Sequence, residues 1–171
     1  MRGVVRIAAF AVAAAIVSGV PALGAGLEAG TRELSFSGTF ESVSGSGNML
    51  QLTAELGFML TEHDEVGPTL GLYQFSVGSD SLTGGSFGAF YRYNFVTKAP
   101  AQVPFVGFRF ERALGDYDLF RDRAEADAGV RLLPVPSVAV NITAFYRRST
   151  SQYAGAARNS AGMALGISFF L

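Results

Sequence analysis

One stretch of the sequence combines side chains that could bind a metal ion or move a proton. The only histidine, His63, lies within Glu62-His63-Asp64-Glu65. A metal site needs ligands that converge, whereas consecutive side chains of an exposed polar turn point in different directions. We therefore interpret residues 61–65 as a turn and expect no metal site there.

Other catalytic and cofactor chemistries lack the residues that they need. The glycine runs at 45–47 and 84–85 are not followed by the Gly-Lys-Ser/Thr of a phosphate-binding loop. The absence of cysteine excludes thiolate catalysis, disulfides and Cys-ligated metals. A net charge of −1 gives no reason to expect nucleic acid as a partner. We expect no enzyme activity, no catalytic residues and no cofactor.

The clearest element of the sequence is its last stretch, where every second residue is large and apolar: Met163, Leu165, Ile167, Phe169 and Leu171. A period of two is typical of a strand whose two faces meet different surroundings. Five apolar residues in register predict a strand with one face against lipid. We interpret it as the closing strand of a barrel.

Similar alternation recurs along the chain from Glu33 onward. Charged residues are only 16% of the sequence, glycine is abundant at 21 of 171 residues, and 15 phenylalanines are present, all of which suit a closed sheet in a membrane. Strands are expected at 33–41, 50–60, 66–77, 87–95, 106–111, 124–132, 138–147 and 163–171. In the third strand the apolar phase changes between Leu72 and Tyr73, and a bulge near Gln74 would reconcile the two halves. The prediction is an all-β, eight-stranded antiparallel up-and-down transmembrane β-barrel.

Charged side chains fall on the other faces of these strands. If those faces point inward, they gather five acids and four arginines, a nearly neutral set that can form ion pairs and plug the lumen. The expected interior network is Glu41, Glu55, Arg92, Arg109, Glu111, Glu125, Asp127, Arg131 and Arg147. Alternation alone leaves open a soluble periplasmic lipocalin-like barrel with an apolar interior that binds an apolar ligand.

The N-terminal segment has the pattern of a secretory signal. Arg2 and Arg6 precede an apolar run from Ile7 to Val17, and small residues follow. We predict a signal peptide at 1–25, cleaved after Gly24 or Ala25, and a barrel domain at 26–171. An even number of strands puts both ends of the barrel on the periplasmic side, so the loops at 112–123 and 149–160 face outward.

Two segments resemble a known family. The stretch 125–142, which reads EADAGVRLLPVPSVAVNI, is similar to the strand-turn-strand of the small outer-membrane β-barrel family of OmpA/OmpX-like proteins, and 56–67 (LGFMLTEHDEVG) is similar to a periplasmic hairpin of that family. The closing strand resembles its assembly signal, with Leu171 at the terminal position and Phe170 one place earlier. These motifs specify architecture and imply no catalytic residues. We expect a monomer in the outer membrane of a Gram-negative-type bacterium, partnered by lipid and, through the C-terminal strand, by the barrel-assembly machinery. The expected role is non-enzymatic, either structural in the envelope or in surface recognition.

Overall fold

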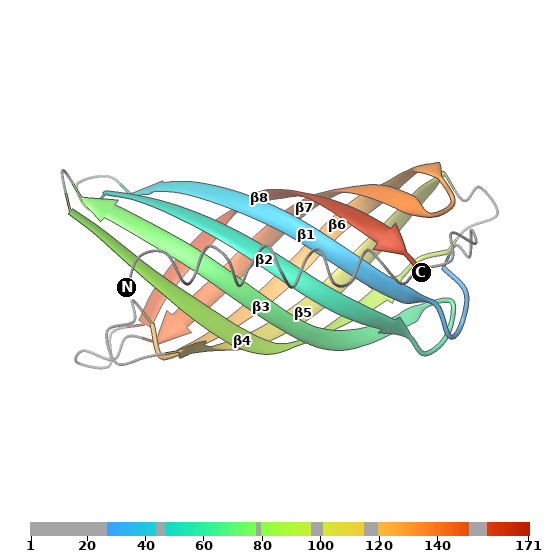
Figure 1. Cartoon of the computed structure of the whole chain (residues 1–171), viewed down its shortest axis with the longest axis horizontal. Helices are drawn as coiled ribbons and strands as arrows, with labels where there is room; N and C mark the ends of the chain where they lie inside the picture. Colours follow the sequence, from blue (N-terminus) through green and yellow to red (C-terminus); the bar gives the residue numbers. More distant parts are fainter. Residues whose placement is uncertain (1–26, 44–46, 78–79, 97–100, 115–119, 151–156) are drawn as a thin grey trace.

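The structure is a closed antiparallel barrel of eight strands, in which each strand pairs with its neighbour in sequence and the last pairs with the first (Figure 1). This computed structural model describes residues 27–43, 47–77, 80–96, 101–114, 120–150 and 157–171. The strands are β1 (Arg32–Val43), β2 (Gly47–Met59), β3 (Asp64–Val77), β4 (Asp80–Asn94), β5 (Gln102–Leu114), β6 (Asp122–Val135), β7 (Val138–Thr150) and β8 (Ala157–Phe170). The predicted fold class is confirmed, and the predicted signal peptide lies outside the described residues.

Alternating side chains give the barrel two unlike surfaces. In β5, Val106, Phe108 and Phe110 are exposed on the outside, while the alternate residues Arg109 and Glu111 are buried inside. Successive side chains of a strand point to opposite faces, so a period of two in the sequence becomes an apolar exterior and a polar interior. This inside-out arrangement is that of a barrel whose outer surface meets lipid.

Several strands extend further than the side-chain pattern predicted. β5 begins at Gln102, although the fifth strand was expected only from 106, and β6 begins at Asp122, inside the loop expected at 112–123. β8 begins at Ala157, whereas a loop was expected up to Ser160. Backbone hydrogen bonds continue the ladder regardless of side-chain polarity, so strands extend beyond the apolar pattern from which they were predicted.

The predicted bulge near Gln74 is wrong. β3 keeps one uninterrupted register against β4, from Asp64↔Tyr93 to Val77↔Asp80, and its pairing with β2 keeps a constant register too. The phase change arises because Tyr73 points inward and is buried, while Leu72 and Gln74 point outward. The register irregularity of the described barrel lies instead between Leu132 and Val135, where Pro134 cannot donate a ladder hydrogen bond.

The two ends of the barrel carry different connections. At one end, which we call the terminal end, Arg32 donates a backbone hydrogen bond to Leu171 at 3.2 Å and accepts one from it at 2.8 Å. The turns β2–β3, β4–β5 and β6–β7 lie at this end. The other end, which we call the loop end, holds the connections β1–β2, β3–β4, β5–β6 and β7–β8.

The closing seam between β1 and β8 is short. Its six pairs run from Glu33↔Phe170 to Gly38↔Leu165. β1 nevertheless stays paired with β2 as far as Val43, and β8 stays paired with β7 from Ala157. β1 and β8 are therefore paired at the terminal end, and they are not paired along the rest of the described strands.

Candidate functional site: the charged barrel interior

The middle of the barrel is crossed by a chain of ion pairs. The strand register places Glu125 of β6 between Arg109 of β5 and Arg147 of β7. Oε1 of Glu125 lies 2.6 Å from Nη1 of Arg109, and its Oε2 lies 2.7 Å from Nη2 of Arg147. Arg109 also donates from Nε to Glu55 at 3.0 Å, which carries the chain across the lumen to β2. Each partner of this chain is buried, so the charges must be satisfied by one another.

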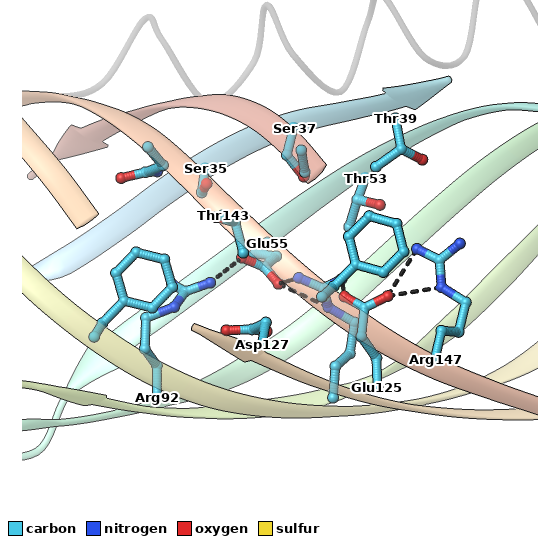
Figure 2. Close-up of a pocket in the computed structure, with 15 residues that line it drawn as sticks. Ser35, Ser37, Thr39, Thr53, Glu55, Arg92, Glu125, Asp127, Thr143 and Arg147 are labelled. Carbon is cyan, nitrogen blue, oxygen red and sulfur yellow. Dashed lines mark hydrogen bonds and ion pairs between the residues drawn. The ribbon is translucent and has the colours of Figure 1, made fainter. Parts of the chain in front are cut away.

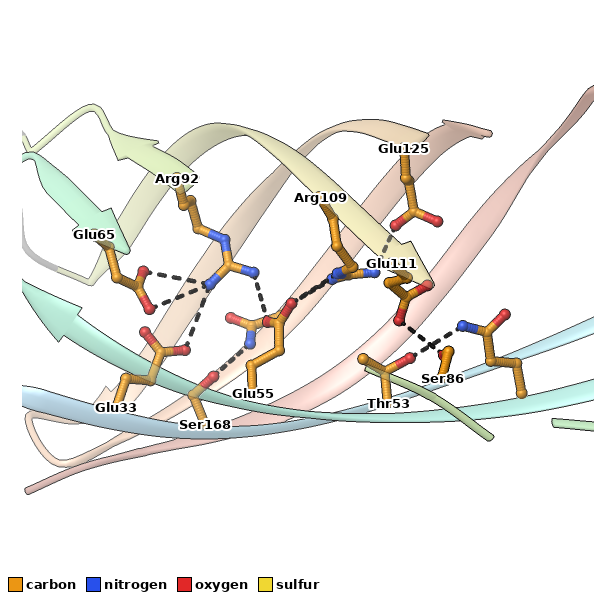
Figure 3. Close-up of polar contacts among 12 residues, drawn as sticks. Glu33, Thr53, Glu55, Glu65, Ser86, Arg92, Arg109, Glu111, Glu125 and Ser168 are labelled. Atoms are coloured by element: carbon orange, nitrogen blue, oxygen red, sulfur yellow. Dashed lines mark hydrogen bonds and ion pairs between the residues drawn. The ribbon is translucent and has the colours of Figure 1, made fainter. Parts of the chain in front are cut away.

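A second cluster lies at the terminal end of the lumen, and Figure 3 shows its members Glu33, Glu65 and Arg92. Nη2 of Arg131 lies 2.8 Å from both Glu33 and Glu65. Arg92 faces the same two carboxylates at 3.9 Å and 3.3 Å and reaches Glu55 at 2.8 Å. Arg131, Glu33 and Glu65 all have 0% exposure. Arg92 thereby links the terminal cluster to the middle of the barrel.

A third group lies toward the loop end. Arg123 donates from Nη1 to Oε1 of Gln51 at 2.7 Å and lies 3.5 Å from Glu111. Ser86 donates its hydroxyl to the other oxygen of Glu111 at 3.3 Å. All four of these side chains are buried. Polar contacts therefore extend along the lumen from one end toward the other.

Aromatic rings lie beside the interior guanidinium groups. The carbon Cζ of Arg123 lies 3.7 Å from the centre of the Phe120 ring, and that of Arg147 lies 4.4 Å from the Phe145 ring. Phe105 lies within 5.1 Å of Arg92. A guanidinium within about 6 Å of a ring centre is attracted by the ring quadrupole. The interior rings therefore help to stabilise the arginines as well as to fill space.

Eight of the nine residues predicted for the interior network are buried in the barrel: Glu55, Arg92, Arg109, Glu111, Glu125, Asp127, Arg131 and Arg147. The side chain of Glu41 lies outside the described residues. Asp127 is buried, but its Oδ1 accepts no hydrogen bond within the described part of the chain. The structure brings the other seven into ion-pair contact with one another or with residues that sequence reasoning missed.

Three charged interior residues were missed by sequence reasoning. Glu65 was assigned to a turn and Arg123 to a loop, and Glu33 was the first polar position of its strand. The sequence could have revealed Glu65, because an even number of positions separates it from Thr69 and Tyr73, so that all three side chains lie on the same, buried face of β3. In all, six carboxylates and five guanidinium groups are buried in the part of the chain that the structure describes.

A small pocket lies in the middle of the lumen, with a volume of about 30 Å³. Hydroxyl side chains, including Ser35, Ser37 and Thr53, form one side of it, and charged residues such as Arg92 and Glu125 form the other (Figure 2). Such a volume holds roughly two water molecules. The pocket is polar, unlike the apolar cavity of a barrel that carries a hydrophobic ligand.

His63 lies at the terminal rim. Its Nδ1 lies 2.9 Å from the backbone oxygen of Asn94, and its Nε2 lies 3.3 Å from Glu62. The ring stacks on Tyr93 at 5.5 Å. Among the described residues, no group of three or more His, Cys, Asp or Glu side chains is placed to hold a metal ion. These contacts give His63 a local role in the β2–β3 turn.

The predicted apolar face of the last strand points outward. Met163, Leu165, Ile167 and Phe169 are exposed, while the alternate residues Ser168 and Phe170 are buried. Leu171 follows the end of β8 and is partly exposed. Within the described ranges, no helix is long and apolar enough to cross a membrane.

The fold defined by these features is that of the small eight-stranded transmembrane β-barrels. Solved structures with this fold include Neisserial surface protein A, with 18% identity, a TM-score of 0.57, and coverage of 81% of this chain and 94% of that one. The N-terminal β-barrel domain of Pseudomonas aeruginosa OprF gives 15% identity, a TM-score of 0.55, and coverage of 84% and 98%. A designed transmembrane β-barrel gives 14% identity with the same TM-score and coverage. The sequence matches no known family model and no curated protein.

Proposed function

We propose that this chain is a non-enzymatic outer-membrane barrel that stabilises the cell envelope or presents its loops for recognition, with a lumen plugged by ion pairs. The observation that carries the proposal is the inversion of polarity between the two surfaces. Large apolar side chains such as Phe40, Leu165 and Phe108 are exposed, while eleven charged side chains of the described residues are buried. A lipid environment makes this arrangement stable, whereas water would favour the reverse.

The inversion argues against the soluble lipocalin-like alternative. That alternative needs an apolar interior to receive its ligand. Here the lumen is occupied by arginines and carboxylates, and its pocket is lined by charged and hydroxyl groups. An apolar ligand would have to displace Arg109 or Glu125 from their partners, which would leave buried charges uncompensated.

The side chains of the interior also do not form a catalytic arrangement. A lipid-modifying barrel of this size would need a base beside a nucleophile. Ser86 donates its hydroxyl to Glu111, but no histidine lies inside the described barrel, because His63 is at the terminal rim. The buried carboxylates are instead held by guanidinium groups. A structural or recognition role fits this arrangement better than an active site.

The remaining features of the proposal concern export and assembly. Residues 1–25 serve as a signal peptide, and 26–171 cross the outer membrane of a Gram-negative-type bacterium as a monomer partnered by lipid. The C-terminal stretch with Met163, Leu165, Ile167, Phe169 and Leu171 is the part recognised by the barrel-assembly machinery. The terminal end then faces the periplasm, and the loop end faces outward.

Cell fractionation tests the location. We expect the chain, expressed with its own N-terminus, to sediment with outer membranes, to resist extraction by urea and to dissolve in detergent. On gels it should migrate faster unheated than boiled, as a folded barrel does. Recovery in the soluble periplasmic fraction, with one gel mobility, would overturn the proposal.

A further inference from the structure

The seam between β1 and β8 stops short of the loop end. Its last pair is Gly38↔Leu165. The same register would next pair Thr39 with Ala164 and Phe40 with Met163, and so on to Val43. These residues are all in strand conformation, yet β1 and β8 share no such pairs in the described chain. Two strand edges therefore face each other without a ladder between them.

The central pocket reaches from behind the end of the paired seam to the start of its open part. Its wall includes Ser37 and Thr39 of β1, Ala164 of β8, and Thr143 of β7. Figure 2 shows Ser37 and Thr39 on the side of the pocket opposite Asp127. The hydroxyl Oγ1 of Thr39 is buried and has no hydrogen-bond partner among the described residues. A polar space of about 30 Å³ with an unsatisfied hydroxyl accepts a small hydrogen-bonding group.

The outer flanks of the open seam are apolar. Phe40 on β1 and Met163 on β8 are each 68% exposed, and Leu165 is 66% exposed. These are the three most exposed large apolar side chains of the described barrel. The open seam thus combines apolar flanks on the outside with a polar pocket on the inside, which is the polarity of an amphiphile.

We propose that the open part of the seam is a lateral site for one membrane lipid of the leaflet at the loop end. A hydroxyl or ester oxygen of its polar part enters between Thr39 and Ala164, and its acyl chains lie on Phe40, Met163 and Leu165. Strand edges in hydrocarbon need hydrogen-bond partners, and the polar part of a lipid supplies them. The pocket volume limits the entering part to a small group. The inference rests on the proposed membrane location.

Paired cysteines test whether the seam is open, and the natural chain has no cysteine to interfere. The test pair is Phe40→Cys with Met163→Cys. The matched control is Phe36→Cys with Ile167→Cys, four residues further along the same seam and paired in the structure. A disulfide requires Cα atoms within about 7 Å. We expect the control pair to oxidise at least tenfold faster. Equal rates would show a zipped seam and overturn the proposal.

A lipid that ends in a small thiol tests the occupant. We expect Ala164→Cys, in vesicles containing a phosphatidylthioethanol and an added oxidant, to form a mixed disulfide and gain the mass of that lipid. Ser168→Cys, inward-facing under the zipped seam, should not. Labelling of Ala164→Cys only by a water-soluble maleimide would make the site a water channel and overturn the proposal. A disulfide-linked dimer of Phe40→Cys would make the occupant a second copy and overturn it too.

Membrane association separates the two proposals. Each variant is first shown to sediment with the vesicles and to keep the gel mobility of a folded barrel. Variants that fold but do not enter vesicles would refute the proposed function. Variants that enter vesicles while Ala164→Cys stays unlabelled would refute the lipid site and leave the membrane location standing.

Discussion

Replacing Arg131 by methionine should destabilise the barrel more than the same substitution at Arg109. Arg131 is fully buried, and its Nη2 lies 2.8 Å from both Glu33 and Glu65. Without it, Glu65 keeps Arg92 at 3.3 Å, but Glu33 keeps a guanidinium only at 3.9 Å. Removing one partner of a buried pair costs about 3–5 kcal/mol, because the other charge is left uncompensated.

The same change at Arg109 gives the comparison that tests this reasoning. After Arg109→Met, Glu55 keeps Arg92 at 2.8 Å and Glu125 keeps Arg147 at 2.7 Å. Only hydrogen bonds to charged groups are lost, so we expect a cost of about 1.5–3 kcal/mol. Arg112→Met, at an exposed pair with Asp122, should change stability by less than about 0.5 kcal/mol.

Reversible urea unfolding in phospholipid vesicles, followed by circular dichroism, measures these free energies. Adding Glu33→Gln to Arg131→Met should recover about 2 kcal/mol, since the amide removes the unmatched charge. A double variant as unstable as the single one would show that Arg131 acts by packing alone. Equal losses at Arg131 and Arg109 would refute the argument from remaining partners.

Three further predictions follow from the two surfaces of the barrel. Ile167→Lys or Val140→Lys, at outward positions that pair with each other, should each lower the free energy of unfolding by about 2–4 kcal/mol and reduce the heat-modifiable band on gels. Gln74→Lys, on the outward face of β3, should cost only about 0–1 kcal/mol. Equal tolerance of all three substitutions would reject the assignment of these positions to lipid. An impermeant maleimide on intact cells should label Thr150→Cys at the loop end and spare Ser137→Cys at the terminal end, and the opposite result would invert the barrel. The purified protein should carry no steady ion current in planar bilayers, because side chains fill an eight-stranded lumen, and a stable single-channel current would refute the plug.

The periodicity of the sequence was sufficient to predict the number of strands and their inward and outward faces. In β5 and β8 the alternation is clean, so Arg109, Ile167 and their neighbours could be assigned to a face without a structure. The phase of the third strand could not be predicted at Tyr73. This ring is buried and packs against Phe120 at 5.4 Å, which explains the phase change that had been attributed to a bulge.

The ion-pair partners could not be predicted from sequence, because they depend on which residues of different tilted strands lie at the same level along the barrel axis. Parity places Glu33 and Arg131 on inward faces, but only the closure of the barrel brings their side chains to 2.8 Å. Glu65 was missed because it lies in a polar run that also contains a turn, and side-chain type alone does not show where the turn ends. The short seam was also invisible, since Thr39 and Ala164 fit the alternation as well as the paired residues do.

The ion pairs of the lumen also bear on how the barrel folds. Arg131 and Glu65 are separated by 66 residues, and Arg123 and Gln51 by 72. Contacts between such distant segments form only when most of the chain is already in place, because closing long loops costs entropy before the contact repays it. Interactions absent from the transition state govern the rate of unfolding, not of folding. The lumen arginines should therefore stabilise the barrel only after the transition state of folding. Without Arg131, the barrel should enter vesicles at an unchanged rate and unfold faster.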